Sequence, residues 1–273
     1  MYLIIIYGIY ANFIDSCYNY SIFIFQFFDI GDSMMTKKRL VLLLLFVLVV
    51  GVVIGANFYT WLNKILAKPV PIGELTKVPE GEGWLDLLAP ENRSFWKNVT
   101  DKKDIFEIQE DGVLHIFGKT LYPLRYVGFS QWTFSDFQLH LEFKLTRRAN
   151  SGVFLRAQWN DPINRGFEVQ VLEDYGKPPT KNSCGAIYDI TTPMYNMSFP
   201  AGQWNSYDIT VQGTEVKVEM NGWLIIHTYL DKMTTPLGKF SVAYASMAKE
   251  GYLLLQDHGG EVWYRNIRIK LLN

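Results

Sequence analysis

A glutamate and a histidine in distant parts of the 273-residue sequence have side chains suited to acid–base chemistry. Glu168 and Gln170 alternate with apolar residues, and because strand side chains have a period of two, we expect both on the open face of one strand. Taken alone, this alternation is also typical of an ordinary solvated sheet face. Gln256 and His258 share a face by the same rule, and histidine exchanges protons near neutral pH. A single histidine at a strand end is, on composition alone, more often a surface residue than a catalyst, so both interpretations stay open.

A second expected strand offers an asparagine and an arginine. The run from Asn150 to Arg156 is predicted to place Asn150, Gly152, Phe154 and Arg156 on one face. The guanidinium of Arg156 is a planar fork of donors that suits sugar hydroxyls or a carbonyl oxygen. The alternative is an ion pair between Arg156 and Glu168. The two roles are compatible, because such a pair would lower the pKa of Glu168 and keep it ionised.

The C-terminal segment is typical of two strands joined by Gly259-Gly260, a dipeptide that tolerates positive φ. If these glycines form a two-residue turn, one face would carry Gln256, His258, Trp263, Arg265, Ile267 and Ile269. Polar and core-forming residues on the same face require a bulge or a strand twist to separate them. Arg265 is therefore a further candidate for substrate binding.

Composition and motifs limit the classes of function. The formal net charge of -1 gives no reason to expect a nucleic-acid partner. No Cys/His cluster or carboxylate loop has metal-ligand spacing, so we predict no catalytic metal, and we expect no cofactor. The sequence contains no Gly-rich phosphate loop, nucleophile elbow or dinucleotide-binding fingerprint.

Residues 84–273 have the pattern of an all-β domain, because turn residues recur at short intervals between β-rich runs. Gln212-Gly213-Thr214 and Asn221-Gly222 are tight-turn sequences, so residues 207–229 are expected to form a three-stranded meander. Many short antiparallel strands favour two packed sheets. The predicted strands are Val113–Phe117, Phe137–Leu145, Gly152–Gln158, Phe167–Leu172, Tyr207–Gln212, Glu215–Met220, Trp223–Tyr229, Lys239–Tyr244, Leu253–Gln256 and Val262–Leu271.

The N-terminal third has a different character. Residues 1–33 are apolar and aromatic without Lys or Arg, and we interpret them as an over-extended gene start, with a first membrane segment as the alternative. Residues 34–66 contain a basic cluster, Lys37–Arg39, and then an apolar run long enough to cross a bilayer. We expect a transmembrane signal anchor there, with a cleaved signal peptide as the alternative. Residues 67–83 are predicted to be a Pro/Gly linker. The positive-inside rule then places the folded domain outside the cytoplasm, at the cell surface or in the periplasm.

Several ordered motifs resemble those of one family. Leu255-Gln-Asp-His-Gly259, followed by Arg265-Asn-Ile-Arg-Ile269, is similar to the closing motif of the 3-keto-disaccharide hydrolase family. The resemblance continues upstream through Asn150–Arg156, Gly166–Leu172, Gly185–Tyr188 and Trp204-Asn205, so it covers about two-thirds of the chain. It implies a concanavalin-like jelly-roll β-sandwich whose concave sheet forms a carbohydrate groove. It also favours the groove, over a solvated face, for Glu168 and Gln170.

Five aromatic residues are candidate platforms for stacking on a sugar: Tyr188, Trp132, Trp159, Trp204 and Trp223. Most tryptophans in a β-sandwich belong to the core. Only Tyr188 and Trp204 lie beside motifs that resemble the family's, so these two are the preferred candidates.

The family resemblance implies an enzyme that cleaves glycosides already oxidised to a ketone at sugar carbon 3. The ketone acidifies the hydrogen on carbon 2, so a base can remove it, the group on carbon 1 leaves, and water adds. Such chemistry needs a base, a donor to the enolate oxygen and an acid for the leaving group. We assign base and acid to Glu168 and His258 in either order, and the enolate donor to Arg156 or Gln170. Gln256 and Tyr188 would orient hydroxyls, and a non-catalytic lectin-like module on a membrane stalk is the alternative.

Overall fold

The computed structural model describes residues 50–51, 55–57, 59, 73–99, 104–119, 124–238, 240 and 242–272. The chain divides into two compact units, residues 1–70 and 71–273. The extension predicted over residues 1–33 and nearly all of the anchor predicted over 34–66 lie outside the described residues. Among the residues that are described, no helix has both the length and the apolar character needed to cross a membrane.

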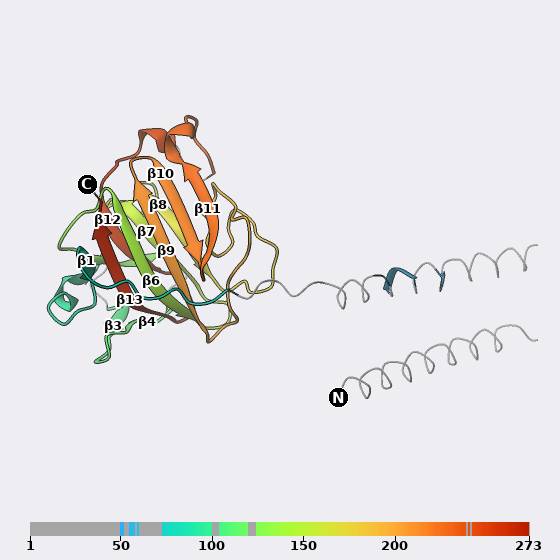
Figure 1. The fold of residues 1–273 in the computed structure, drawn as a ribbon, viewed down its shortest axis with the longest axis horizontal. Helices are drawn as coiled ribbons and strands as arrows, with labels where there is room; N and C mark the ends of the chain where they lie inside the picture. Colours follow the sequence, from blue (N-terminus) through green and yellow to red (C-terminus); the bar gives the residue numbers. More distant parts are fainter. Residues whose placement is uncertain are drawn as a thin grey trace, which may run out of the picture. The chain divides into compact units, whose positions relative to one another are not determined.

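The unit 71–273 is a sandwich of two antiparallel sheets (Figure 1). The eight-stranded sheet has the order β11-β10-β9-β6-β13-β4-β3, with β1 also paired to β13. Its strands are β1 Trp84–Asp86, β3 Phe106–Ile108, β4 Leu114–Ile116, β6 Phe137–Leu145, β9 Trp204–Gln212, β10 Glu215–Met220, β11 Trp223–Tyr229 and β13 Val262–Leu271. The five-stranded sheet has the order β2-β5-β12-β7-β8. Its strands are β2 Trp96–Asn98, β5 Arg125–Phe129, β7 Asn150–Ala157, β8 Phe167–Leu172 and β12 Tyr252–Asp257.

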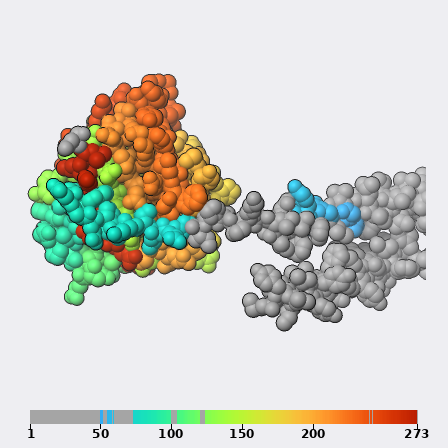
Figure 2. Space-filling view, viewed as in Figure 1, coloured from blue at the N-terminus to red at the C-terminus, as the bar shows by residue number. Residues whose placement is uncertain are grey.

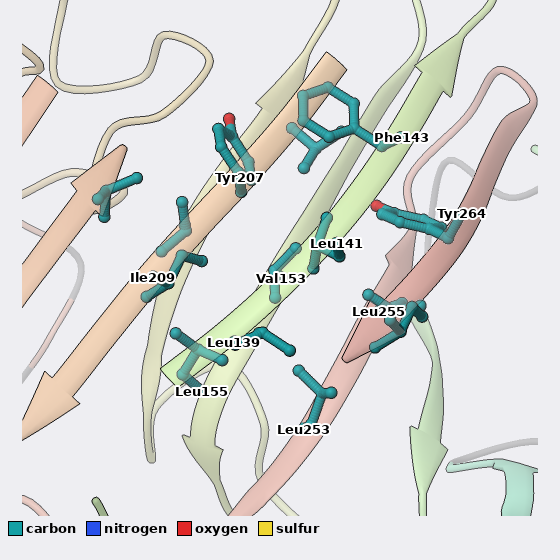
Figure 3. Packing of buried hydrophobic residues seen from close by; sticks show 14 of the residues in the cluster. Leu139, Leu141, Phe143, Val153, Leu155, Tyr207, Ile209, Leu253, Leu255 and Tyr264 are labelled. Atoms are coloured by element: carbon teal, nitrogen blue, oxygen red, sulfur yellow. The ribbon is translucent and has the colours of Figure 1, made fainter. Parts of the chain in front are cut away.

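The core lies between the sheets, where alternate residues of both pack together. β6 contributes Leu139 and Leu141, and β7 contributes Val153 and Leu155, all at most 1% exposed. Figure 3 shows these side chains meeting residues of β9, β12 and β13 in the space between the strands. Because successive strand side chains point to opposite faces, burying one set fixes which residues the outer face of each sheet presents.

The pattern predictions hold where alternation is long and turns are marked. β6, β8, β10, β11 and β13 have the predicted bounds. The meander of β9, β10 and β11 is confirmed, with Gly213, Asn221 and Gly222 at positive φ in its turns. The strand predicted over Lys239–Tyr244 is wrong over its described residues, because Tyr244 begins a 3-10 helix, Tyr244–Ser246. Two further 3-10 helices span Arg93–Phe95 and Leu230–Lys232.

The Gly259-Gly260 turn does not join a hairpin. Both glycines have positive φ, +96° and +78°, and they carry the chain from β12 in one sheet to β13 in the other. The expectation that Gln256 and His258 share a face with Trp263 and Arg265 is therefore wrong. The expected bulge is present in β13, where the pairing register with β6 shifts between Arg265 and Arg268.

The described part of the predicted linker lies against the eight-stranded sheet. The amide of Glu74 donates to the carbonyl of Asn221, and the amide of Thr76 donates to the hydroxyl of Ser206 at 3.1 Å. The Thr76 hydroxyl donates to the carboxylate of Asp208. Figure 2 shows this segment on the surface across the meander strands. Residues 73–83 therefore belong structurally to the sandwich, although their Pro/Gly-rich neighbourhood predicts a linker.

Candidate active site

Polar residues gather on the outer face of the five-stranded sheet. The inner faces of β7 and β8 carry Val153, Leu155, Val169 and Val171, so Gly152 and Glu168 are directed to the other side. In the register of the two strands, Gly152 lies opposite Gln170 and Phe154 lies opposite Glu168. The prediction that Glu168 and Gln170 share a face away from the core agrees with this register.

The carboxylate of Glu168 lies over Gly152. A Cβ atom built on Gly152 would come within 2.1 Å of the Oε1 atom of Glu168 and within 2.8 Å of its carboxyl carbon. Only a residue without a side chain leaves this space. Glu168 is 4% exposed, so its carboxylate is nearly buried in the space above Gly152. The amide of Tyr188 donates to the carbonyl of Glu168 at 2.9 Å, which fixes the half-exposed Tyr188 beside this strand.

His258 is held by Asn150. The Nδ2 atom of Asn150 lies 2.8 Å from the Nδ1 atom of His258. The backbone supports this contact, because the amide of Asn150 donates to the carbonyl of Gly259 at 2.9 Å. The positive φ of the glycine turn after β12 folds the chain back onto the start of β7 and so delivers His258 to this position.

The two proton-transfer candidates contact positions that lie two residues apart on one strand. Glu168 lies on Gly152, and His258 is bonded to Asn150, two residues earlier on the same face of β7. Two residues along a strand span about 7 Å. The carboxylate and the imidazole therefore belong to one face of the sheet, on the scale of a sugar ring.

Tyr126 is a site residue that the sequence patterns did not identify. It lies on β5 opposite Gln256 of β12 and is 2% exposed. Burial raises the pKa of the Tyr126 hydroxyl well above its usual value, the neighbouring Gln256 side chain opposes that rise, and the charge of Glu168 adds to it. Tyr126 therefore stays protonated and can donate a hydrogen bond beside a carboxylate. Its strand, β5, carries no clear alternation, so only its place in the sheet identifies it.

Three side-chain oxygens at this face have no hydrogen-bond partner within the described part of the chain: Oδ1 of Asn150, Oε1 of Gln256 and the hydroxyl of Tyr126. Buried polar atoms in folded proteins are nearly always paired, and exceptions concentrate at functional sites. Asn150 and Gln256 are predicted from the sequence to lie in the substrate site, and Tyr126 is the residue paired with Gln256 across the sheet.

Arg156 does not lie at this face, and the prediction that it shares a face with Asn150 and Gly152 is wrong. Arg156 has a φ of +50°, which turns the end of β7 and directs the side chain toward the edge of the other sheet. There its guanidinium donates to the carbonyls of Ser135 and Gly213 and to the carboxylate of Asp136 at 2.8, 2.7 and 2.9 Å. The expected ion pair with Glu168 is replaced by this one.

We expect Arg156→Met to lower the free energy of unfolding by about 1–3 kcal/mol, because it removes the buried guanidinium that donates to the carbonyls of Ser135 and Gly213 and pairs with the carboxylate of Asp136. Chemical denaturation measures the loss. Turnover per folded molecule should be unchanged, since Arg156 is 3% exposed and engaged elsewhere. A loss of turnover in the fully folded variant would contradict this assignment.

Trp204 and Arg265 also lie elsewhere, on the outer face of the eight-stranded sheet. The guanidinium carbon of Arg265 lies 4.1 Å from the ring centroid of Trp204, and its Nε atom donates to Glu142 at 2.5 Å. The ammonium of Lys144 lies 5.0 Å from the same ring. The indole of Trp204 is therefore in contact with the side chains of Arg265 and Lys144. The prediction that Trp204 and Arg265 join the groove residues is wrong, because β9 and β13 belong to the opposite sheet.

The described residues contain no group of three or more His, Cys, Asp and Glu side chains arranged to hold a metal ion. The absence of a catalytic metal stays a prediction.

Comparisons with known proteins identify the family. Residues 83–270 match the 3-keto-alpha-glucoside-1,2-lyase-like domain. A 3-keto-disaccharide hydrolase of Bacteroides thetaiotaomicron is 30% identical over 173 residues, which is 51% of this chain and 60% of that relative's length.

Solved structures confirm the sandwich fold. Two candidate glycosyl hydrolases from Parabacteroides distasonis superpose with a TM-score of 0.60 each, at 23% and 22% identity. The matches cover 69% and 72% of this chain and 99% and 100% of theirs. The resemblance read from the sequence motifs is thus confirmed: the chain belongs to the family of 3-keto-alpha-glucoside-1,2-lyase-like domains.

Proposed function

We propose that the protein is an enzyme that cleaves 3-keto-glycosides by elimination followed by hydration. One observation supports this most strongly. The carboxylate of Glu168 lies over Gly152 and the imidazole of His258 contacts Asn150, which is the next residue on the same face of β7. The family relationship supports this class of substrate. The site geometry supplies the groups that the reaction requires.

In the first step, the carboxylate of Glu168 removes the proton from carbon 2 of the sugar. The electron pair of that C–H bond forms an enolate with the ketone at carbon 3. A donor to the enolate oxygen lowers the energy of this intermediate. Tyr126 and Gln256 lie side by side on β5 and β12, and the Tyr126 hydroxyl remains protonated, so we assign this role to them. Of the two donors predicted from the sequence, Arg156 lies at another face and Gln170 stays a candidate.

In the second step, the enolate electrons form a double bond between carbons 1 and 2 while the bond from carbon 1 to the leaving oxygen breaks. His258 donates a proton to that oxygen. Asn150 holds the Nδ1 edge of the ring, so we assign proton transfer to Nε2. The Asn150 amide can donate to a neutral imidazole or, with its oxygen turned toward Nδ1, accept from a protonated one. Water then adds to carbon 1 and carbon 2 regains a proton, which completes a net hydrolysis.

A direct displacement by two carboxylates is the usual alternative for cleaving a glycoside. The site residues placed here include one carboxylate, Glu168, together with an imidazole, a phenol and amides. This donor set suits removal of an acidified proton better than it suits an oxocarbenium route.

Incubation with a 3-keto-glucoside and with the matching unoxidised glucoside tests the proposal. We expect release of the aglycone from the 3-keto compound only. Binding of plain oligosaccharides without turnover of either compound would instead establish a lectin-like module.

We further propose that the domain acts outside the cytoplasm on a membrane anchor formed by residues 34–66. The basic cluster followed by a long apolar run supports this. Fractionation of the full chain with a protease-protection assay tests it, and recovery in the soluble cytoplasmic fraction would overturn it.

A further inference from the structure

An apolar cluster shares the outer face of the five-stranded sheet with the polar site. Four of its side chains are at most 2% exposed: Tyr126, Phe154, Ala157 and Leu254. Five more are partly exposed and pack against them: Val99, Leu124, Trp159, Ile163 and Tyr252. We refer to these five as the apolar shelf. None of the five carries a charge, in contrast to the polar residues beside them.

The pairing register connects Glu168 to Gly128, the glycine beneath Trp159 of the apolar shelf. Across the sheet, Glu168 lies opposite Phe154, Phe154 opposite Leu254, and Leu254 opposite Gly128. Adjacent strands are about 4.8 Å apart, so this row extends about 14 Å across the sheet from Glu168 to Gly128. The neighbouring row contains Gln170, Gly152, Gln256 and Tyr126. A polar row and an apolar row therefore run side by side from the catalytic end of the groove.

Trp159 is seated on Gly128 much as Glu168 is seated on Gly152. A Cβ atom on Gly128 would lie 2.3 Å from the Cδ2 atom of Leu254, and 2.8 Å from the Cζ3 atom and 3.1 Å from the Cη2 atom of the Trp159 indole. The ring of Tyr252 meets the indole edge-on, with centroids 5.0 Å apart at 74°. A glycine on β5 thus creates the space that holds this tryptophan over the sheet.

The loop that carries Trp159 is closed by its own backbone hydrogen bonds. The amide of Gln158 donates to the carbonyl of Arg165 at 2.8 Å, and the amide of Arg165 donates to the carbonyl of Asp161 at 3.1 Å. The indole is therefore in position before any ligand binds, which lowers the entropic cost of binding.

We propose that the shelf binds an apolar, ring-bearing aglycone, so that the preferred substrates are 3-keto-glycosides of hydrophobic alcohols. The proposal rests on the proposed function and specifies its substrate class. The sugar lies over the polar row, where hydroxyls find amides and a phenol, and the aglycone extends over Trp159, Ile163 and Tyr252. A second sugar in that place would need hydrogen-bond donors and acceptors, whereas apolar ligand groups are bound by apolar and aromatic side chains.

Two 3-keto-α-glucosides with alcohols of similar acidity, methyl and cyclohexylmethyl, test this inference. We expect wild-type kcat/KM to be about tenfold or more higher for the cyclohexylmethyl compound, the scale on which an apolar pocket discriminates added methylenes. Trp159→Ala should abolish the preference, so that kcat/KM for the cyclohexylmethyl compound falls to the value for the methyl compound. Trp159→Phe should retain part of the preference. Trp223→Ala, a tryptophan on β11 of the other sheet that is 37% exposed, serves as the control and should leave the preference unchanged.

Three results would overturn the inference. The wild type could cleave both compounds equally. Trp159→Ala could slow both to the same extent in a folded protein, which would make the indole a packing residue of its loop. A 3-keto-disaccharide could be cleaved faster than the cyclohexylmethyl compound in a manner that depends on Trp159, which would identify the shelf as a second sugar site.

Failure of the proposed function gives a different result, because then neither 3-keto compound is cleaved. Calorimetric titration with the unoxidised methyl and cyclohexylmethyl α-glucosides then decides the inference alone. Tighter binding of the cyclohexylmethyl compound that is lost in Trp159→Ala supports the shelf, and equal binding overturns it.

Discussion

Glu168→Gln lowers kcat/KM for a 3-keto-glucoside by about 10²-fold or more, the usual contribution of an acid–base group. Glutamine keeps the shape of the side chain and its seat over Gly152, but it cannot accept the carbon 2 proton. The measurement is steady-state release of the aglycone by the purified variant. His258→Ala is expected to slow the reaction on the same scale, because the leaving oxygen loses its proton donor.

A glutamate of the other sheet provides the matched control. Glu219 lies on β10, and Glu219→Gln removes a charge without touching the proposed site, so we expect wild-type turnover. Wild-type turnover by Glu168→Gln would remove the carboxylate from the mechanism and leave His258 as the only candidate base.

Gly152→Ala should abolish most of the activity while preserving the fold. The added methyl group would overlap the carboxylate of Glu168, with Oε1 only 2.1 Å from the Cβ position. The glutamate side chain can move aside, but a displacement on the order of 1 Å costs about 10²-fold in rate. Replacing glycine by alanine also restricts the unfolded chain, which favours the folded state by about 0.4–1 kcal/mol where the backbone permits. We therefore expect a large loss of kcat/KM with little change in Tm.

A double-mutant cycle separates this mechanism from general damage. If alanine acts only by displacing the carboxylate, Gly152→Ala should add little to the loss already caused by Glu168→Gln. Independent, multiplying losses would show that the alanine harms the site by another route. A large fall in Tm would show that the strand itself cannot accept the methyl group.

The fold was largely predictable because its longest strands alternate regularly. β6, β8 and β13 alternate core and outer residues over most of their length, and glycine or Asn-Gly turns mark the ends of the meander. β5 lacks such a signal. Its residues Arg125–Phe129 include Gly128 and are mostly buried, so period two is hidden. Tyr126 on this strand could be found only from its pairing with Gln256.

The positions of the candidate site residues could be predicted where side chains alternate regularly along a strand. They could not be predicted where the backbone departs from extended geometry. Strand alternation correctly predicted that Glu168, Gln170, Asn150 and Gln256 lie on the face of their strands that points away from the core. It failed for Arg156 because a positive φ at the end of β7 reverses the direction of the side chain. A local pattern in the sequence does not report such a turn.

The second failure concerns which sheet a strand joins. Trp204 and Arg265 lie close in sequence to motifs of the groove, but β9 and β13 pair with β6 in the other sheet. Sheet membership is set by pairings between residues far apart in the chain. For the same reason, Trp159 could not be distinguished from a core tryptophan until its seat on Gly128 was seen.

The kinetic isotope effect at carbon 2 tests the central claim most directly. A 3-keto-glucoside carrying deuterium on carbon 2 should be cleaved more slowly by the wild-type protein than its protiated counterpart, since Glu168 must break that bond before the aglycone can leave. Cleavage of the two compounds at the same rate, with full retention of deuterium on carbon 2 of the released sugar, would mean that this C–H bond is not broken during the reaction. The proton-abstraction role of the carboxylate over Gly152 would then be contradicted.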